Sequence, residues 1–146
     1  MEIHHAMIVR SSPSRLYQAL TQQRELQVWM DAPTIAIPEV GSIIEFQYDQ
    51  GRRTMKMEIS HLDVDKQVKW RVIQALWSNE VVDQTITWTL SMVEDSTLVD
   101  FRMEGWKSHD AAFASISYKW ALFMVRLKIS MGDTREIASL LSIDAN

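Results

Sequence analysis

Between residues 44 and 103 the chain contains five successive segments in which apolar and polar side chains alternate. A period of two places every second side chain on the same face of a β-strand. The apolar residues of the five segments are Ile44, Phe46 and Tyr48; Met55, Met57 and Ile59; Val68, Trp70 and Val72; Val82, Ile86, Trp88, Leu90 and Met92; and Val99, Phe101 and Met103. Because polar turns separate these segments, they predict an antiparallel meander with one apolar face.

A long helical pattern after Ser108 supplies the cover that this apolar face needs. Its apolar residues recur every three to four positions, at Phe113, Ile116, Trp120, Phe123, Met124 and Leu127. Ser108 or Asp110 can cap the start of this helix, and Gly132 is a typical C-terminal stop. No other predicted element is long enough to cover the meander, so the sequence predicts an α+β fold with the sheet packed on this helix.

The N-terminal part of the chain predicts one further strand and two short helices. Residues 2–10 alternate weakly, as expected for a strand. Ser12-Pro13 is typical of an N-cap followed by proline at the first helical position. Thr21 is expected to cap a second short helix ending at Trp29, whose side chain should turn inward. Residues 30–41 contain two prolines and a glycine and are expected to form an irregular connection.

The length of 146 residues fits one domain, expected to span residues 1–132 and to be followed by an extension, 133–146, that forms a short helix or a loosely docked tail. No apolar run approaches the roughly 20 residues that a membrane span requires, and the first ten residues do not resemble a signal peptide. We therefore expect a cytoplasmic protein. The net charge of -4 argues weakly against a nucleic-acid partner, and the lack of cysteine excludes disulfides and thiolate metal ligands.

Residues 11–30, SSPSRLYQALTQQRELQVWM, resemble the entry motif of the START/Bet v 1-like superfamily, also called SRPBCC. The residues that carry this likeness are Ser12, Pro13, Leu16, Tyr17, Ala19, Leu20, Thr21, Leu26 and Trp29. Residues 40–46, VGSIIEF, are similar to the second strand of the family, and Gly105-Trp106 before a long helix ending at Gly132 is similar to its closing element. Over about residues 2–132, the order of these motifs most resembles the branch similar to the activator of heat-shock protein 90 ATPase.

This resemblance implies a helix-grip fold, in which a curved antiparallel sheet of about six strands surrounds a long C-terminal helix, with an apolar cavity between them. Members of the superfamily bind lipids, sterols, polyketides or other hydrophobic molecules, and some catalyse cyclisation or dehydration in the cavity. The branch has no fixed catalytic signature, so the resemblance assigns no catalytic residue to this chain.

Large aromatic and thioether side chains on the predicted inner faces are typical of the wall of a small-molecule site. The candidate ligand-binding residues are Trp29, Met57, Trp70, Gln84, Trp88, Phe101, Phe113, Trp120 and Met124. Trp88 on the sheet and Trp120 on the covering helix should approach each other across the interior. Gln84 is a polar residue on the inner face of its strand, where it either orients a ligand or lies at the frayed strand start in contact with water.

The remaining polar residues give little support for catalysis or metal binding. His4 and His5 are adjacent in a predicted strand, so they point to opposite faces and cannot share a metal ion. No cluster of His, Asp and Glu has the spacing of a metal site, and a hydrogen-bonded role for His5 is favoured over an acid–base role. The chain contains neither a G-x-S-x-G elbow nor a glycine-rich phosphate loop, so no metal and no cofactor are expected.

Three functions remain open at this point. The first is binding of a hydrophobic or aromatic small molecule in the cavity. The second is an enzyme of the cyclase, dehydratase or hydrolase type, for which His5, Glu58, Asp83 and Tyr118 are the available polar groups. The third is a co-chaperone-like or homodimeric interaction module that uses Trp77, in an expected loop over residues 74–81, and the tail residues Ile137, Leu140 and Leu141.

Overall fold

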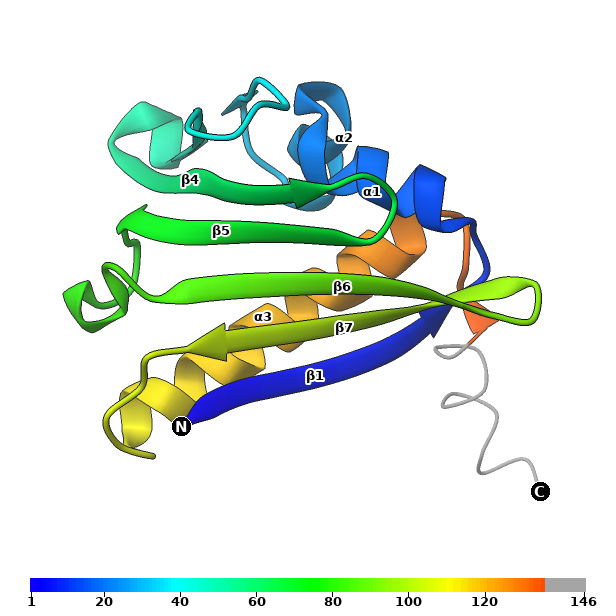
Figure 1. The fold of residues 1–146 in the computed structure, drawn as a ribbon. Coiled ribbons are helices and arrows are strands. Elements are labelled where there is room, and N and C mark those ends of the chain that lie inside the picture. The colour runs from blue at the N-terminus through cyan, green and yellow to red at the C-terminus, as the bar shows by residue number, and fades with distance from the viewer. Residues whose placement is uncertain (136–146) are drawn as a thin grey trace.

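In the computed structural model, which describes residues 1–135, one antiparallel sheet curves around one long helix (Figure 1). The strands are β1 (Glu2–Val9), β2 (Thr34–Ile35), β3 (Ile43–Tyr48), β4 (Arg53–Asp63), β5 (Gln67–Gln74), β6 (Thr85–Val93) and β7 (Ser96–Glu104). The helices are α1 (Pro13–Thr21), α2 (Gln23–Trp29) and α3 (Ala111–Ser130), with short 3₁₀ turns η1 (Asp49–Gly51) and η2 (Asn79–Val81). The α+β helix-grip prediction is confirmed. The expected contribution of Ile137, Leu140 and Leu141 lies outside the described residues.

The sheet has the strand order β1-β7-β6-β5-β4-β3-β2, so β3 to β7 form the predicted meander. The first strand pairs with the last, with His5 opposite Phe101. The sheet has seven strands, where about six were expected, because Thr34 and Ile35 pair with Phe46 and Glu45 as the short strand β2. That pairing lies inside residues 30–41, which were expected to be irregular.

The two short helices follow β1 as predicted, but they are joined differently. The Ser12 hydroxyl accepts a hydrogen bond from the Arg15 backbone N–H at 3.1 Å, as an N-cap should. Thr21 was expected to cap the second helix, and this is wrong: Thr21 is the last residue of α1, and its hydroxyl donates to the Tyr17 carbonyl at 2.8 Å. The helix breaks at Gln22, whose backbone is extended and whose side chain makes no capping bond.

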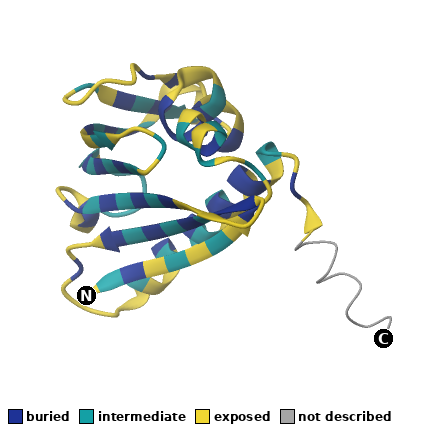
Figure 2. Cartoon of the chain, turned by 45° about the vertical axis from the view of Figure 1, so that its right-hand side comes forward, coloured by how far each residue is buried: buried dark blue, intermediate teal, exposed yellow. Residues whose placement is uncertain are grey.

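The long helix α3 crosses the concave face of the sheet (Figure 1). Asp110 caps it by accepting from the Phe113 backbone N–H at 3.1 Å, and the chain leaves it through Gly132 at φ +82. Ile116, Trp120, Met124 and Leu127 are buried on the face turned to the sheet. Figure 2 shows buried and more exposed residues alternating along the strands, as the period of two predicts.

Two details of the predicted apolar face differ in the structure. β6 begins at Thr85, and Val82 lies just after η2 with 36% of its surface exposed. Met92, at the other end of β6, is 71% exposed, although its position in the alternation predicted burial. It precedes the hairpin that joins β6 to β7. The apolar face is thus buried in the middle of β6 and exposed near its end.

Candidate functional site

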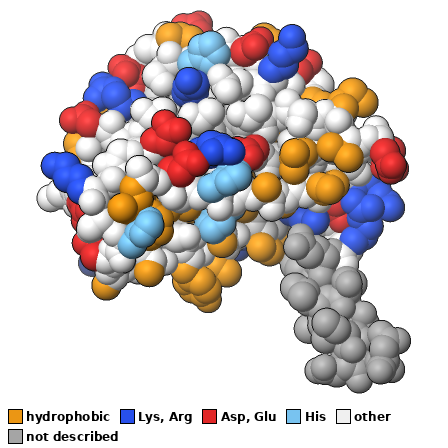
Figure 3. Space-filling model, turned by 60° about the horizontal axis from the view of Figure 1, so that its bottom comes forward, with side chains coloured by type: hydrophobic (Ala, Val, Ile, Leu, Met, Phe, Trp, Pro, Cys, Tyr) orange, Lys and Arg blue, Asp and Glu red, His pale blue; other side chains and the backbone are white. Residues whose placement is uncertain are grey.

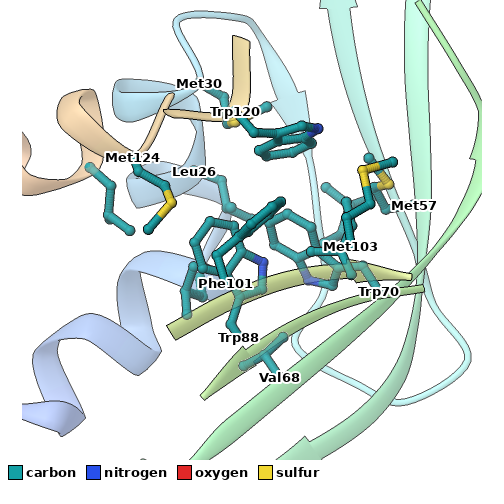
Figure 4. Packing of buried hydrophobic residues seen from close by; sticks show 14 of the residues in the cluster. Leu26, Met30, Met57, Val68, Trp70, Trp88, Phe101, Met103, Trp120 and Met124 are labelled. Atoms are coloured by element: carbon teal, nitrogen blue, oxygen red, sulfur yellow. The ribbon is translucent and has the colours of Figure 1, made fainter. Parts of the chain in front are cut away.

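Four aromatic rings surround Trp88 in the centre of the core, and Figure 4 shows Trp70, Phe101 and Trp120 near it. Its ring centroid lies 4.9 Å from that of Phe101, 5.6 Å from Trp70, 5.8 Å from Trp29 and 6.3 Å from Trp120, all in edge-to-face arrangements. These five side chains are fully or almost fully buried. Edge-to-face contacts of this kind are favourable because the positive edge of one ring meets the negative face of another. The predicted approach of Trp88 and Trp120 is confirmed.

An apolar depression lies beside this aromatic cluster, between the first half of α3, the chain after β5 and the inner face of the sheet. The free space within it is small, about 10 Å³, which is room for about one water molecule, and the depression is partly open to solvent. The sheet contributes Met55, Met57, Val72 and Met103, the loop and η2 contribute Ala75, Leu76, Trp77 and Val81, and α3 contributes Ile116 and Trp120. All of these side chains are apolar. The depression therefore offers a surface for hydrophobic contacts.

The loop after β5 is fixed over the depression by contacts of its own. The Trp77 ring packs on Phe123 of α3 with centroids 6.0 Å apart, and the Lys119 ammonium group lies 5.0 Å from the centroid of the Trp77 ring. The Arg53 guanidinium donates to the Leu76 carbonyl at 2.6 Å. Trp77 thus forms part of the wall, and two cationic side chains lie at the rim.

The structure brings only part of the predicted set of site residues to this depression. Met57 and Trp120 line it. Trp29, Trp70, Trp88, Phe101 and Met124 are packed in the core, and the Trp29 indole N–H donates to the Ala19 carbonyl at 2.8 Å. Phe113 is half-buried and packs edge-to-face on Trp106 at 5.2 Å.

Several lining residues were not among the candidates. Met55, Met103 and Ile116 belong to the predicted inner faces, so the alternation could have found them. Trp77 lies in a loop without periodic pattern, and nothing in the sequence assigns it to a wall. The sequence marks which side chains point inward, whereas the unfilled space depends on how they pack together.

Gln84 lies next to the depression and is buried, with 5% of its surface exposed. Its backbone N–H donates to the Val81 carbonyl at 3.0 Å, and its carbonyl accepts from the Val72 N–H at 3.0 Å, so two lining residues flank it. Both side-chain amide atoms are buried without a hydrogen-bond partner among the described residues. The indole N–H groups of Trp70, Trp88 and Trp106 are also buried without a hydrogen-bond partner among the described residues. Buried polar groups in proteins are generally paired, so these atoms require an explanation.

The ionisable groups lie mostly away from the depression. His5 Nε2 is 3.0 Å from the Ser117 carbonyl oxygen and 3.2 Å from the Ser117 hydroxyl, which ties β1 to α3. On the outer face of the sheet His4 contacts Asp100 at 2.7 Å. Figure 3 shows histidines next to acidic and basic side chains on the face it presents. Residues 1–135 contain no group of three or more His, Cys, Asp and Glu that could hold a metal ion.

Tyr48 and Asp133, both outside the depression, have strongly shifted pKa values. Burial raises the pKa of Tyr48 to about 12, and the nearby Asp31 carboxylate acts in the same direction. The Tyr48 hydroxyl donates to the Met30 carbonyl at 3.0 Å. Hydrogen bonds from the Arg135 side chain, together with the Arg10 backbone N–H, hold the pKa of Asp133 well below its usual value. These groups stabilise the fold around α2 and at the end of α3.

No helix within residues 1–135 is long and apolar enough to cross a membrane.

Solved structures with the same fold cover most of this chain. The solution structure of the Aha1 dimer from Colwellia psychrerythraea matches with a TM-score of 0.80 and 27% identity, over 90% of this chain and 96% of that one. A crystal structure of a Mesorhizobium loti protein matches with a TM-score of 0.78 and 18% identity, over 90% and 97% of the two chains. An AHSA1-like protein from Aeromonas hydrophila matches with a TM-score of 0.71 and 10% identity, over 90% and 92%.

Among curated proteins, no match to this chain was found. A family model described as "Activator of Hsp90 ATPase homolog 1-like protein" matches residues 10–132, which include α1, α2, α3 and the strands β2 to β7. The expected likeness to this branch of the SRPBCC superfamily is confirmed. The chain belongs to the activator of Hsp90 ATPase homolog 1-like family.

Proposed function

We propose that this protein binds a hydrophobic or aromatic small molecule in the depression between α3, the loop after β5 and the sheet. The observation that carries this proposal is the partly open depression beside the core, whose lining side chains are all apolar and which a ligand would enter by displacing side chains of the wall. Burial of apolar ligand surface there is favourable by roughly 25 cal/mol for each Å² removed from water. Trp77 and Trp120 contribute aromatic side chains to the lining, and a ligand ring can pack against them.

The three methionines of the wall support a site that adapts to its ligand. Met55, Met57 and Met103 come from β4 and β7 and face the same space. Their unbranched thioether side chains change rotamer at low cost, so the site can widen as a ligand enters. Figure 4 shows Met57 and Met103 next to each other beside the aromatic cluster.

The character of the lining favours binding over acid–base catalysis. A cyclase, dehydratase or hydrolase requires at least two titratable groups facing the reacting atoms. The described lining side chains are methionines, tryptophans and aliphatic residues, and His5 is turned to Ser117 of α3. We therefore place the enzyme hypothesis behind the binding hypothesis.

A titration with hydrophobic probes tests the proposal. Saturable changes in tryptophan fluorescence are expected with 2-naphthol or 1-octanol, because Trp77 and Trp120 line the site. Ala75→Phe fills the depression and should weaken binding by roughly tenfold or more, which corresponds to about 1.4 kcal/mol. Ala114→Phe, on an exposed position of α3, is the matched control and should bind as the unmodified protein does.

Two results would count against a ligand site in the depression. One is a lack of saturable response to every aliphatic and aromatic probe. The other is equal binding by the Ala75→Phe and Ala114→Phe variants. Native mass spectrometry of the purified protein complements the titration, since a retained small molecule would identify the ligand class directly.

We also propose that two copies of this chain associate through the outer face of α3. Tyr118, Leu122, Val125 and Ile129 are 39–66% exposed on that face, and they follow one another at spacings of four, three and four residues. This is the spacing of a helix–helix seam, and a two-fold dimer would pair the same face of both copies. The similar Colwellia psychrerythraea protein is described as a dimer.

Light scattering of variants tests this association. Leu122→Lys places a charge in the middle of the seam and should convert a dimer to a monomer with an unchanged circular dichroism spectrum. Val40→Lys is the control, because Val40 is 61% exposed in the connection between β2 and β3. A monomeric unmodified protein, or a dimer broken by Val40→Lys and not by Leu122→Lys, would contradict the assignment of α3.

A further inference from the structure

Gln84 directly precedes β6, and its side chain lies next to Gly105, the residue that follows β7. A Cβ atom placed on Gly105 would lie 3.1 Å from the Gln84 Cγ, so this side chain passes where the glycine leaves room. Gly105 has φ +111, in the region that favours glycine. Trp106 follows directly and is 4% exposed. Gln84 and Trp106 thus both adjoin Gly105, at one corner of the inner face.

This corner borders the proposed binding site on several sides. Val72 and Val81 are hydrogen-bonded to the Gln84 backbone, and Met103 lies two residues before Gly105, near the end of β7. All three line the depression. Phe113, which contacts Trp106, lies one helical turn before the lining residue Ile116. The buried polar corner is thus next to the apolar depression.

We propose that the ligand of this site ends in a neutral group that both donates and accepts hydrogen bonds, such as a hydroxyl or a primary amide, and that Gln84 binds this group. The inference rests on the binding function proposed above. Gln84 offers one acceptor and one amide donor group, and Trp106 offers one N–H donor, none of which has a partner among residues 1–135. A ligand hydroxyl donates to the Gln84 Oε1 and accepts from the Gln84 amide or the Trp106 indole.

A neutral group fits this corner better than a carboxylate. Burial of an anion without a cationic partner is costly, and the surrounding residues Val72, Val81 and Met103 are apolar. The two cations near the depression, Arg53 and Lys119, contact Leu76 and Trp77 at the rim. The ligand reaches the corner when the flexible Met103 side chain moves aside. The apolar part of the ligand then stays against the lining.

The experiment compares 1-octanol with octyl methyl ether, which lacks the hydroxyl donor. The unmodified protein should bind octanol at least roughly tenfold more tightly than the ether, a difference of about 1.4 kcal/mol. Gln84→Leu should bind both probes with the affinity that the unmodified protein has for the ether. Gln18→Leu, at an exposed position of α1, is the control and should keep the preference for octanol.

A melting curve of the Gln84→Leu variant without ligand shows whether the substitution changes the stability of the fold. Because the amide has no described partner, its removal should leave the melting temperature unchanged or raise it. A clearly lowered melting temperature would show that the amide is already satisfied in the free protein and would overturn the proposal. So would equal binding of both probes by the unmodified protein, or an octanol preference that survives Gln84→Leu. Binding of neither probe would instead refute the binding function itself.

Discussion

The indole rings of Trp88 and Trp120 lie 6.3 Å apart at an interplanar angle of 71°, and they join the middle of the sheet to the middle of α3. Trp88 also contacts Trp29 and Trp70, whereas Trp120 lines the depression. The pair therefore marks the boundary between the filled core and the proposed ligand site. Through Trp120, the wall of that site contacts the aromatic cluster of the core directly.

Replacement of Trp88 by alanine should strongly destabilise the fold. The side chain is fully buried among four aromatic rings, and its removal leaves a cavity. We expect a loss of about 3–5 kcal/mol in the free energy of unfolding, measured by urea denaturation. Trp88→Phe keeps part of the packing and should lose clearly less. Similar losses for both variants, or a loss below about 1 kcal/mol for the alanine variant, would show that this ring is not central to the core.

The glycine at position 105 should tolerate alanine poorly. A new Cβ would meet the Gln84 Cγ at 3.1 Å, whereas at Gly41, which also has a positive φ, it would meet no atom within 4 Å. Both variants strain the backbone, but only Gly105→Ala adds a steric conflict, which typically costs about 1–3 kcal/mol. Thermal or urea unfolding should rank Gly105→Ala below Gly41→Ala. Combining Gly105→Ala with Gln84→Ala should recover part of the difference; additive losses would argue against the contact.

The partly buried tyrosine Tyr48 should make the protein less stable in alkali. Its pKa is about 12 in the folded protein and 10.0 as the reference for the unfolded chain. Above pH 10 the unfolded chain loses the proton first, so the free energy of unfolding falls between about pH 10 and pH 12. Tyr48→Phe should show a smaller decrease over this interval, measured by urea unfolding at several pH values. Parallel pH profiles of the two proteins would contradict this assignment.

The ionised carboxylate of the buried residue Asp133 should stabilise the fold at neutral pH and lose this effect in acid. Its folded pKa is lowered from 3.8, so its stabilising effect is complete above pH 3.8 and is lost as the pH falls toward the folded pKa. Asp133→Asn should be less stable than the unmodified protein at pH 7, and the difference should shrink at pH 3. Asp63→Asn, at the exposed end of β4, serves as the control in the same unfolding experiment. A difference that is as large at pH 3 as at pH 7 would exclude the charge as its cause.

The meander and its covering helix could be predicted from the sequence because each is a regular pattern with many members. The strand β2 could not be predicted, since it has only two residues and a segment that short shows no period. Met92 follows the alternation, but its burial depends on where the covering elements end. Threonine is a common N-cap residue, and only the folded chain shows that the Thr21 hydroxyl donates to the preceding turn of its own helix.

The candidate site was predictable only as a set of inward-facing side chains. Trp70 and Trp120 both satisfy the pattern, yet one is packed among other rings and the other borders unfilled space. This difference arises from the combined volumes of side chains on separate elements, which a pattern along one strand does not contain. Gln84 was left open between orienting a ligand and contacting water; the structure shows it buried, and its role is the subject of the proposed experiment.

The pairing of β1 with β7 has a consequence for how the chain acquires its fold during synthesis. Glu2 is opposite Glu104, so the first strand to leave the ribosome finds its partner only after nearly all of the sheet has been made. Contacts between such distant residues are slow to form because a long loop must close first. The hairpins from β3 to β7 can assemble before that step, and the N-terminal strand then completes the edge of the sheet. A truncated nascent chain that lacks β7 leaves β1 without its partner in the native sheet.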